Sequence, residues 1–234
     1  MMKMNKKMKA AVLTAALCAL FSAGSTLYAA GNNAEPAELD GDTVEYDTKT
    51  GIIKASGDVL MKKGAAMVTG VRAQYNSKSQ EGIVTGNVIA VKENMRMTCD
   101  TVRTDGQNHM LATGSVHGTQ EDKTFSGEQV DYYPDTQYVV IATGGVITSK
   151  DGTFTADHME GWMNENHFKG IGNAHLVSPP KNLEAGGNQV DYYGQDQGKA
   201  VITGNAWAIQ DNNTLKSNTL TLYLDNNGDA QVQQ

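Results

Sequence analysis

Proline, aromatic residues and charge are all scarce in this chain of 234 residues, which has 4 prolines, 6% aromatic residues and 19% charged residues. Coiled coils and acidic disordered tails both need dense charge, so the composition excludes them. Glycine is abundant instead, with 25 residues. Many glycines with few charges are typical of a chain of short strands joined by tight turns.

Basic residues are also in the minority, because 19 lysines and arginines face 26 aspartates and glutamates, for a net charge of −7. A nucleic-acid-binding protein relies on lysine and arginine to neutralise phosphates. The charge balance therefore excludes nucleic acid as a partner.

The first thirty residues have the pattern of a secretory signal peptide. Lysines gather before residue 10, residues 10–21 are apolar, and small residues follow as far as Ala30. We expect residues 1–29 to form a signal peptide cleaved after Ala29. An uncleaved anchor is the alternative, but the apolar run is shorter than the ~20 residues that span a bilayer. The mature chain then keeps Cys99 as its one cysteine, which excludes an internal disulfide.

After this segment the sequence repeats itself about every 29 residues. Each unit has a short alternating run, turn residues, and a longer strand with a central glycine, as in Val44 to Tyr46 followed by Ala55 to Val59. The repeat glycines are Gly57, Gly86, Gly114, Gly144, Gly172 and Gly204. A fixed period of this kind indicates a repeat architecture. We predict an all-β fold, with a flexible linker at 30–40, one domain at 41–225 and a tail at 226–234.

Side-chain parity predicts which face of these strands is buried, because successive residues point to opposite faces. The register of the repeat glycine carries no charge through six units, whereas the opposite register is mostly polar. A packed core is one interpretation. The recurrence of glycine and alanine favours a second, an apolar groove with room for lipid. The residues predicted to contact lipid are Ile53, Ala55, Val59, Met61, Val84, Val88, Met97, Met110, Val116, Phe125, Val140, Val146, Phe154, Leu176 and Ile202.

The repeat also resembles a known family. Its pattern of Val44, Tyr46, Gly51, Ala55 and Gly57, matched by Tyr75, Gly82, Gly86 and Asn87 and again by Val190, Tyr192, Gly204 and Asn205, is similar to that of the OstA-like lipopolysaccharide-transport proteins. The resemblance covers about residues 40 to 225. The chain departs from the pattern near Thr101, at Trp162 and at Pro179-Pro180.

This resemblance implies a twisted, open β-jellyroll of antiparallel strands that holds lipid A acyl chains inside. It implies a periplasmic carrier or bridge that moves lipopolysaccharide from the inner to the outer membrane. The implied partners are lipopolysaccharide, membrane-bound transport proteins with similar jellyroll domains, and further copies of the chain joined head to tail.

Signals for catalysis, metal binding and cofactors are weak. His117 and His175 share a repeat position, but no cysteine or carboxylate cluster near them has metal-ligand spacing. Asp131 and Asp191 recur in Val-Asp-Tyr-Tyr, which we interpret as a solvated position beside buried neighbours. We predict no enzyme activity, no metal and no cofactor. The alternatives are a parallel β-helix that binds or cleaves glycans, and a scaffold repeat protein without a ligand.

The sequence also predicts how copies associate. Residues 219–224 alternate cleanly without proline, lysine or glycine, so they form an unprotected strand edge. A second candidate edge lies at 42–46, and two unlike edges pair head to tail. The alternative is that residues 225–234 fold back and cover the C-terminal edge.

Overall fold

The computed structural model describes residues 37–233 apart from 64, 93, 107–108, 121–122, 134, 166, 194–197 and 225–229. The described residues are almost entirely β-strand, and the two short 3-10 helices are η2 (Met163–Glu165) and η3 (Pro179–Lys181). All strand pairings with a known register are antiparallel, as between β3 and β4 or β14 and β15. The predicted all-β class of antiparallel strands is confirmed, and the parallel β-helix is excluded.

The chain divides into two compact units where the sequence predicts one domain. The N-terminal unit comprises Met1–Glu121 and Gln129–Asp135, and the C-terminal unit comprises Asp122–Glu128 and Thr136–Gln234. The strand β8 (Lys123–Tyr133) therefore contributes residues to both units. In repeat proteins each unit of structure contacts only its neighbours, so such a division needs no linker.

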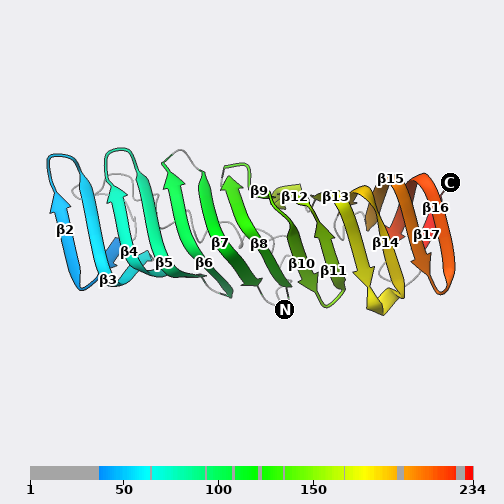
Figure 1. Cartoon of the computed structure of the whole chain (residues 1–234), viewed down its shortest axis with the longest axis horizontal. Helices are drawn as coiled ribbons and strands as arrows, with labels where there is room; N and C mark the ends of the chain where they lie inside the picture. Colours follow the sequence, from blue (N-terminus) through cyan, green and yellow to red (C-terminus); the bar gives the residue numbers. More distant parts are fainter. Residues whose placement is uncertain are drawn as a thin grey trace, which may run out of the picture. The chain divides into compact units, whose positions relative to one another are not determined.

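The N-terminal unit is a series of long strands in sequence order (Figure 1). Its strands are β1 (Ala37–Asp40), β2 (Thr43–Asp47), β3 (Ile52–Lys63), β4 (Ala66–Asn76), β5 (Glu81–Lys92), β6 (Met95–Asp105) and β7 (Met110–Gln120). Both β1 and β2 pair with β3, at its two ends, and each later strand to β7 pairs with the one before it. The starts of β3, β5 and β7 at Ile52, Glu81 and Met110 confirm the predicted period of about 29 residues.

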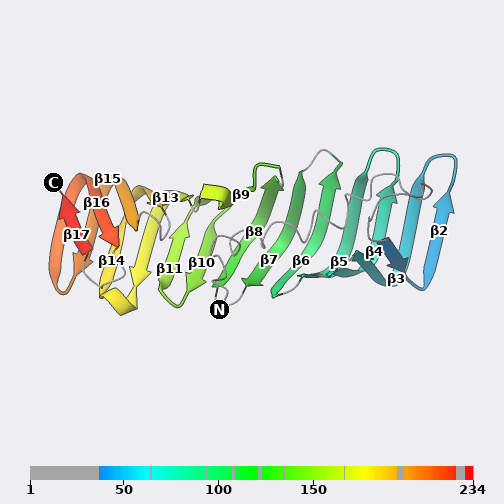
Figure 2. The ribbon, with the colours of Figure 1, turned by 180° about the vertical axis from the view of Figure 1, so that it is seen from behind.

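The C-terminal unit begins with short strands and continues with long ones (Figure 2). Its strands are β9 (Tyr138–Ile141), β10 (Gly145–Ser149), β11 (Gly152–Ala156), β12 (His158–Trp162), β13 (His167–Ser178), β14 (Leu183–Tyr193), β15 (Lys199–Gln210), β16 (Asn213–Leu224) and β17 (Ala230–Gln233). The strands β9 and β12 pair with each other, as do β10 and β11, and both β11 and β12 pair with β13. From β13 to β17 each strand pairs with the next.

The repeat glycine makes a bulge in the middle of each long odd-numbered strand. Gly86 and Asn87, for example, both have left-handed backbone, with φ of +87° and +48°, and the register with β6 shifts there by one residue. Glycine, and next to it asparagine, tolerate this conformation best. The same pair recurs at Gly57, Gly114, Gly172 and Gly204, each followed by Asp, Ser or Asn. Backbone geometry therefore explains the Gly-Asn signature of the repeat.

This geometry corrects the expectation that the repeat glycines leave room for a ligand. A Cβ on Gly86 would lie 2.8 Å from Val71 Cβ, and one on Gly57 or Gly114 would collide with Asp42 or Asp100. These collisions lie on the exposed side of the sheet, because Val71, Asp42 and Asp100 are all exposed. The repeat glycines serve the bulge and do not widen the interior.

Each bulge bends its strand, and the pieces on either side form two layers that enclose the buried side chains. Phe154 shows the packing across these layers, because a Cβ added to Gly170 would lie 2.5 Å from Phe154 Cζ. Inside the bends, glycine makes room for a neighbour, as Gly70 does for Val84 and Gly187 does for Ile202. Each unit thus has a closed core between its layers.

The strand boundaries differ from the predicted ones at both ends of the domain. Residues 37–40, which the sequence assigns to the linker, form β1 and pair with Leu60–Lys63. Residues 230–233, assigned to the tail, form β17 and pair with Thr221–Leu224. Both stretches add backbone hydrogen bonds to strand edges that are otherwise open. The predicted signal peptide at 1–29 lies outside the described residues.

Candidate functional site

We call the buried side of the strands the inner face, and in the N-terminal unit it consists of cross-strand rows of small and flexible side chains. One row, on the N-terminal side of the bulge of β3, runs through Ala55, Ala73, Val84, Val102 and Ala112, and a second, on the other side of that bulge, runs through Met61, Val68, Ala90, Met97 and Gly118. Val68, Val84 and Val102 have no exposed surface. These rows are free of charge and hydrogen-bonding groups.

In the C-terminal unit the inner face contains bulkier side chains. One row runs through Ile141, Met159, Gly170, Val190, Ile202 and Leu220, and another runs through Phe125, Ile147, Phe154, Leu176, Ala185, Ala208 and Leu215. Val190 and Ile202 are at most 1% exposed, whereas Phe125, Phe154 and Leu176 are half-buried. Phe154 occupies the space that Gly170 leaves in the facing layer.

Most of the side chains predicted to contact lipid lie on the inner face. Those at most 9% exposed are Ala55, Val59, Met61, Val84, Val88, Met97, Met110, Val116 and Ile202. Ile53, Phe125, Phe154 and Leu176 are half-buried. The structure thus brings these residues into two buried sets, one in each unit.

Val140 and Val146 are corrections to the predicted inner face. Val146 is 39% exposed, and Val140 pairs with Glu160 in an outer row. The cause is a shift of one residue, because Ile141 and Gly145 are the buried positions that flank this bend. Here Gly144 has the left-handed backbone of a repeat glycine, with φ of +73°, but Gly145 lacks the positive φ of the Asp, Ser or Asn that follows the glycine in other repeats. The apparent match of Thr-Gly-Gly-Val to the repeat hides this shift.

Of the inner residues of the even-numbered strands, the sequence prediction included only Met97 and Phe125 and missed the others. Val68, Val102 and Leu222 are at most 1% exposed, yet none lies in a repeat with a central glycine. The buried register of β4 switches from Ala73 to Gly70 as the strand bends. The alternation of Met95, Met97 and Cys99 in β6 was the signal that pointed to these positions.

Titratable groups report how apolar the interior is. Burial, with a smaller contribution from Asp100, raises the pKa of the Cys99 thiol to about 11. Burial also raises the pKa of Tyr75 and Tyr192, which lie opposite Ile53 and Phe168. A medium that disfavours charge in this way suits hydrocarbon better than a polar ligand.

The inner face meets solvent at the ends of the strand series. At the start of the N-terminal unit, Val44 and Tyr46 of β2 are 47% and 50% exposed although they continue inner rows. In the C-terminal unit, a cavity of about 170 Å³ is lined by Leu183, Ala208, Leu215 and Leu222 together with polar residues of the β15–β16 turn. Leu215 and Leu222 lie on opposite sides of the bend in β16, so this cavity opens between the two layers.

The outer face carries histidine–carboxylate contacts that sequence reasoning missed. In Gln129 to Tyr133, Asp131 Oδ1 lies 2.8 Å from His109 Nε2 and Asp131 Oδ2 accepts a hydrogen bond from Gln129. The same pentapeptide at 189–193 repeats both contacts, with His167 Nε2 3.1 Å from Asp191. These aspartates are therefore paired, not solvated as predicted. The described residues include no group of three metal-ligating side chains.

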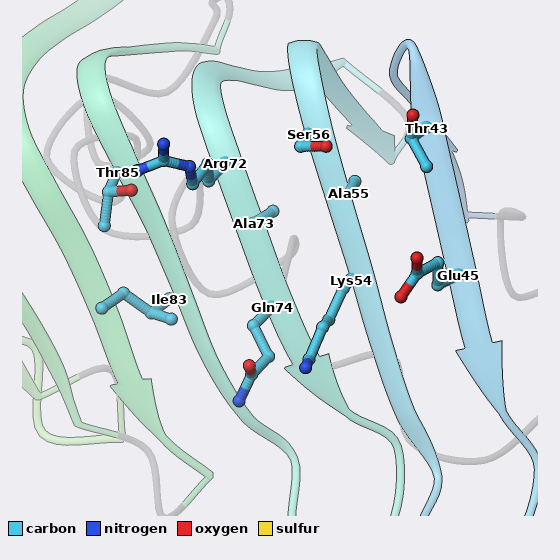
Figure 3. A pocket seen from close by; sticks show the side chains of 10 residues that line it. All are labelled: Thr43, Glu45, Lys54, Ala55, Ser56, Arg72, Ala73, Gln74, Ile83 and Thr85. Atoms are coloured by element: carbon cyan, nitrogen blue, oxygen red, sulfur yellow. The ribbon is translucent and has the colours of Figure 1, made fainter.

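A hollow of about 400 Å³, lined by both polar and apolar residues, lies on the outer face of β2 to β5 (Figure 3). We call it the β2–β5 trough. Its lining residues are Thr43, Glu45, Lys54, Ala55, Ser56, Arg72, Ala73, Gln74, Ile83 and Thr85. Figure 3 shows Lys54 and Gln74 extending the same way from neighbouring strands, while Arg72 leans toward Thr85.

Comparison with known families finds a similarity to transport proteins. Residues 67–167 match the family described as "LptA/(LptD N-terminal domain) LPS transport protein". This match, which spans less than half of the chain, confirms the predicted resemblance to OstA-like proteins. The matched family is one of transport proteins, not of enzymes.

Among solved structures, the chain is similar to LptH from Pseudomonas aeruginosa, which is described as the LptA-homologous periplasmic component of the lipopolysaccharide transport device. The identity is 22% and the TM-score 0.41, over 45% of this chain and 80% of LptH. No curated protein matches the chain. Among the described residues, no helix has the length and apolar character to span a membrane.

Proposed function

We propose that this chain is a periplasmic lipopolysaccharide carrier or bridge that holds acyl chains against the inner face. The match of residues 67–167 to the lipopolysaccharide-transport family supports the lipid class. The observation that carries the proposal is the inner face itself, which presents uncharged rows such as Met61, Val68, Ala90 and Met97 through successive strands. Each methylene moved from water onto such a surface gains about 0.8 kcal/mol.

For lipid to enter, the two layers must separate. The pattern of hydrogen bonds within each unit permits this separation. Within each unit the ladder hydrogen bonds run between neighbouring strands of one layer, as from Ala55 to Ala73, whereas contacts between layers are made by side chains. Separation therefore breaks no ladder hydrogen bond and exchanges apolar contacts for acyl contacts. Methionines such as Met61, Met97 and Met110 adapt to such exchange because their side chains are unbranched.

The open ends of the inner face are the proposed points of entry and exit. Val44 and Tyr46 offer an exposed apolar surface at the N-terminal end, and in the C-terminal unit the cavity near the buried Leu183 and Leu222 opens between the two layers. We propose that jellyroll domains of inner- and outer-membrane transport proteins, or a second copy, continue the apolar path there. In this proposal the signal peptide at 1–29 directs the chain to the periplasm.

Head-to-tail association needs revision in view of β17. The backbone of β17 pairs with Thr221–Leu224, so part of the predicted C-terminal edge is occupied within the chain itself. Among the described pairings, β2 has a partner only on the side of β3, and residues 213–220 of β16 have one only on the side of β15. We propose that these stretches join successive copies, and that β17 limits the joining.

Lipid extraction tests the carrier function. Protein purified from the periplasm of cells that make lipopolysaccharide, extracted and analysed by mass spectrometry, is expected to release lipid A species in near-stoichiometric amounts. Protein from the same cells with a polar inner face, such as Tyr46→Asp combined with Leu222→Asn, is the matched control and is expected to release less. Clean wild-type protein that turns over no glycan would support the ligand-free scaffold and overturn the proposal.

Sedimentation at increasing concentration tests the association. Deletion of 225–234 is expected to shift the monomer–oligomer equilibrium toward oligomers, because it uncovers Thr221–Leu224. Val44→Pro, which removes a backbone donor from β2, is expected to shift it toward monomer. Full-length and shortened proteins that both stay monomeric at hundreds of micromolar would exclude the bridge and leave a shuttle.

A further inference from the structure

The β2–β5 trough lies on the outer face, although its lining also includes Ala55 and Ala73, which belong to an inner row. Its floor is a grid of outward side chains in two cross-strand rows, Thr43, Ser56, Arg72 and Thr85 in one, and Glu45, Lys54, Gln74 and Ile83 in the other. Regular pairing over four strands fixes the spacing of these groups. The trough volume of about 400 Å³ lies in the range of small-molecule sites.

The trough is locally cationic in a chain that carries a net charge of −7. Lys54 and Arg72 line it against the single carboxylate of Glu45. Lys54 pairs with Gln74 and Ser56 pairs with Arg72, so the two cations are diagonal neighbours on adjacent strands, roughly 7–8 Å apart at the backbone. In Figure 3 Arg72 leans toward Thr85 and Lys54 extends beside Gln74, so a change of side-chain rotamer has to accompany the binding of one anion between them.

These cations are available to a ligand. Within the described part of the chain, neither Lys54 nor Arg72 has an ion-pair or hydrogen-bond partner. The nearest acid, Glu45, pairs with Lys54 across the strands and turns toward it in Figure 3. Arg72 is therefore the stronger anchor for an anion, because it presents a planar fork of donors with no carboxylate beside it.

The remaining lining residues indicate which chemical groups the ligand carries besides its anionic group. Hydroxyls of Thr43, Ser56 and Thr85 and the amide of Gln74 both donate and accept hydrogen bonds. Such groups match a ligand rich in hydroxyls. We propose that the β2–β5 trough binds a phosphorylated saccharide, with the phosphate at Arg72 and Lys54 and the sugar hydroxyls on the Ser, Thr and Gln side chains.

The ligand has two possible sources, a soluble sugar phosphate or the headgroup of a glycolipid. The glycolipid source rests on the proposed function. The strand β2 separates the two surfaces by its own width, because Val44 and Tyr46 continue the inner rows whereas Thr43 and Glu45 line the trough. A glycolipid at this end of the N-terminal unit can therefore present its chains to one surface and its headgroup to the other.

Calorimetric titration with glucose 1-phosphate, glucose and inorganic phosphate tests the site without any lipid. We expect glucose 1-phosphate to bind more tightly than the other two. Arg72→Gln is expected to weaken its binding by about tenfold, the loss of one charge-assisted contact. Glu45→Gln is expected to strengthen binding about twofold, because it removes a like charge. The matched control is Arg103→Gln, an exposed arginine on the same outer face of β6 that does not line the trough.

Several results would overturn this proposal. Equal weakening by Arg72→Gln and Arg103→Gln would show unspecific attraction to positive charge. If inorganic phosphate bound as tightly as the sugar phosphate, the saccharide would make no contribution to binding and the proposed ligand class would be wrong. A second arm compares lipopolysaccharide with its dephosphorylated form: a loss on Arg72→Gln confined to the phosphorylated lipid supports the glycolipid source. Lipid extraction from the Arg72→Gln protein still tests the inner face, so the two proposals fail separately.

Discussion

Strands of both units are bent at the same kind of Gly-Asn bulge, but different side chains pack inside the bend in each unit. In the N-terminal unit the inner face is made of alanine, valine and methionine, as at Ala73, Val84 and Met97. In the C-terminal unit it includes Phe125, Phe154 and Phe168, which are all the phenylalanines of the described chain. The Gly-Asn bulge is therefore independent of the side chains that pack beside it.

This difference in side-chain size indicates which unit deforms more easily. Small and unbranched side chains repack at low cost, whereas a ring that fits over a glycine has one good position. The outer face of the C-terminal unit is also braced, because His167 stacks between Trp162 and Tyr193 at centroid distances of 4.7 and 4.5 Å. We expect the N-terminal unit to open more readily for a ligand.

The largest expected effect comes from placing a charge at equivalent-looking valines of the two units. Val88→Asp buries an unpaired carboxylate at a position that is 1% exposed, so we expect a loss of roughly 3–5 kcal/mol in the free energy of unfolding. Val146→Asp is its counterpart at 39% exposure and is expected to change little. Urea unfolding measures both, and equal losses would contradict the one-residue shift at Gly144.

Phe154→Ala tests the tighter packing of the C-terminal unit. We expect it to cost about 3 kcal/mol, because a large cavity forms over Gly170. Gly170→Ala alone is also expected to destabilise, since its Cβ collides with the ring. Combined, the two changes are expected to cost less than their sum. Strict additivity in a thermal or urea double-mutant cycle would argue that Phe154 does not cross between the layers.

The two histidine–aspartate pairs allow a smaller comparison between the units. His167→Ala removes a hydrogen bond to Asp191 and two stacked rings, so we expect about 1–2 kcal/mol of destabilisation. His109 stacks on Tyr133 alone, and His109→Ala is expected to cost less. His117→Ala is the exposed control, with a change within about 0.5 kcal/mol. If His109→Ala destabilised the protein more than His167→Ala, the result would contradict the stabilising role assigned to ring stacking.

The smallest expected effect is a pH dependence from Cys99. Its pKa rises from 9.0 to about 11 on folding, so above pH 9 the unfolded chain releases the thiol proton before the folded chain does. The free energy of unfolding therefore falls as pH rises from 9 to 11, by under about 1 kcal/mol at pH 9.5. Cys99→Ala is expected to remove this part of the slope. An unchanged slope would mean that the thiol titrates alike in both states.

Much of this fold is predictable because one motif determines both backbone and burial. The pair Gly86 and Asn87 sets the period, and the residues two positions away from the glycine, Val84 and Val88, are buried. Parity counted from this motif therefore finds the inner face of β5 directly. It does so equally in β3, β7, β13 and β15, which share the motif.

The remaining features depend on information that the motif lacks. At Thr143-Gly144-Gly145 the Gly-Gly pair looks like the Gly-Asn pair of other repeats, and sequence alone does not show that only Gly144 adopts a positive φ. The pairing of His109 with Asp131 joins residues 22 apart on neighbouring strands. The glycines also misled, because their small size suggested open space, whereas a Cβ at Gly57 or Gly86 would collide with Asp42 or Val71.

Site-specific photo-crosslinking in cells tests the central claim, that acyl chains lie on the inner face, most directly. A benzophenone-bearing phenylalanine at Tyr46 or Phe154 replaces one ring by another on this face, and Asp47 and Thr155 are adjacent positions on the opposite face that do not line the β2–β5 trough. We predict that irradiation captures lipopolysaccharide at Tyr46 and Phe154 and at neither neighbour. Equal capture from both faces, or capture at Asp47 and Thr155 alone, would contradict the account.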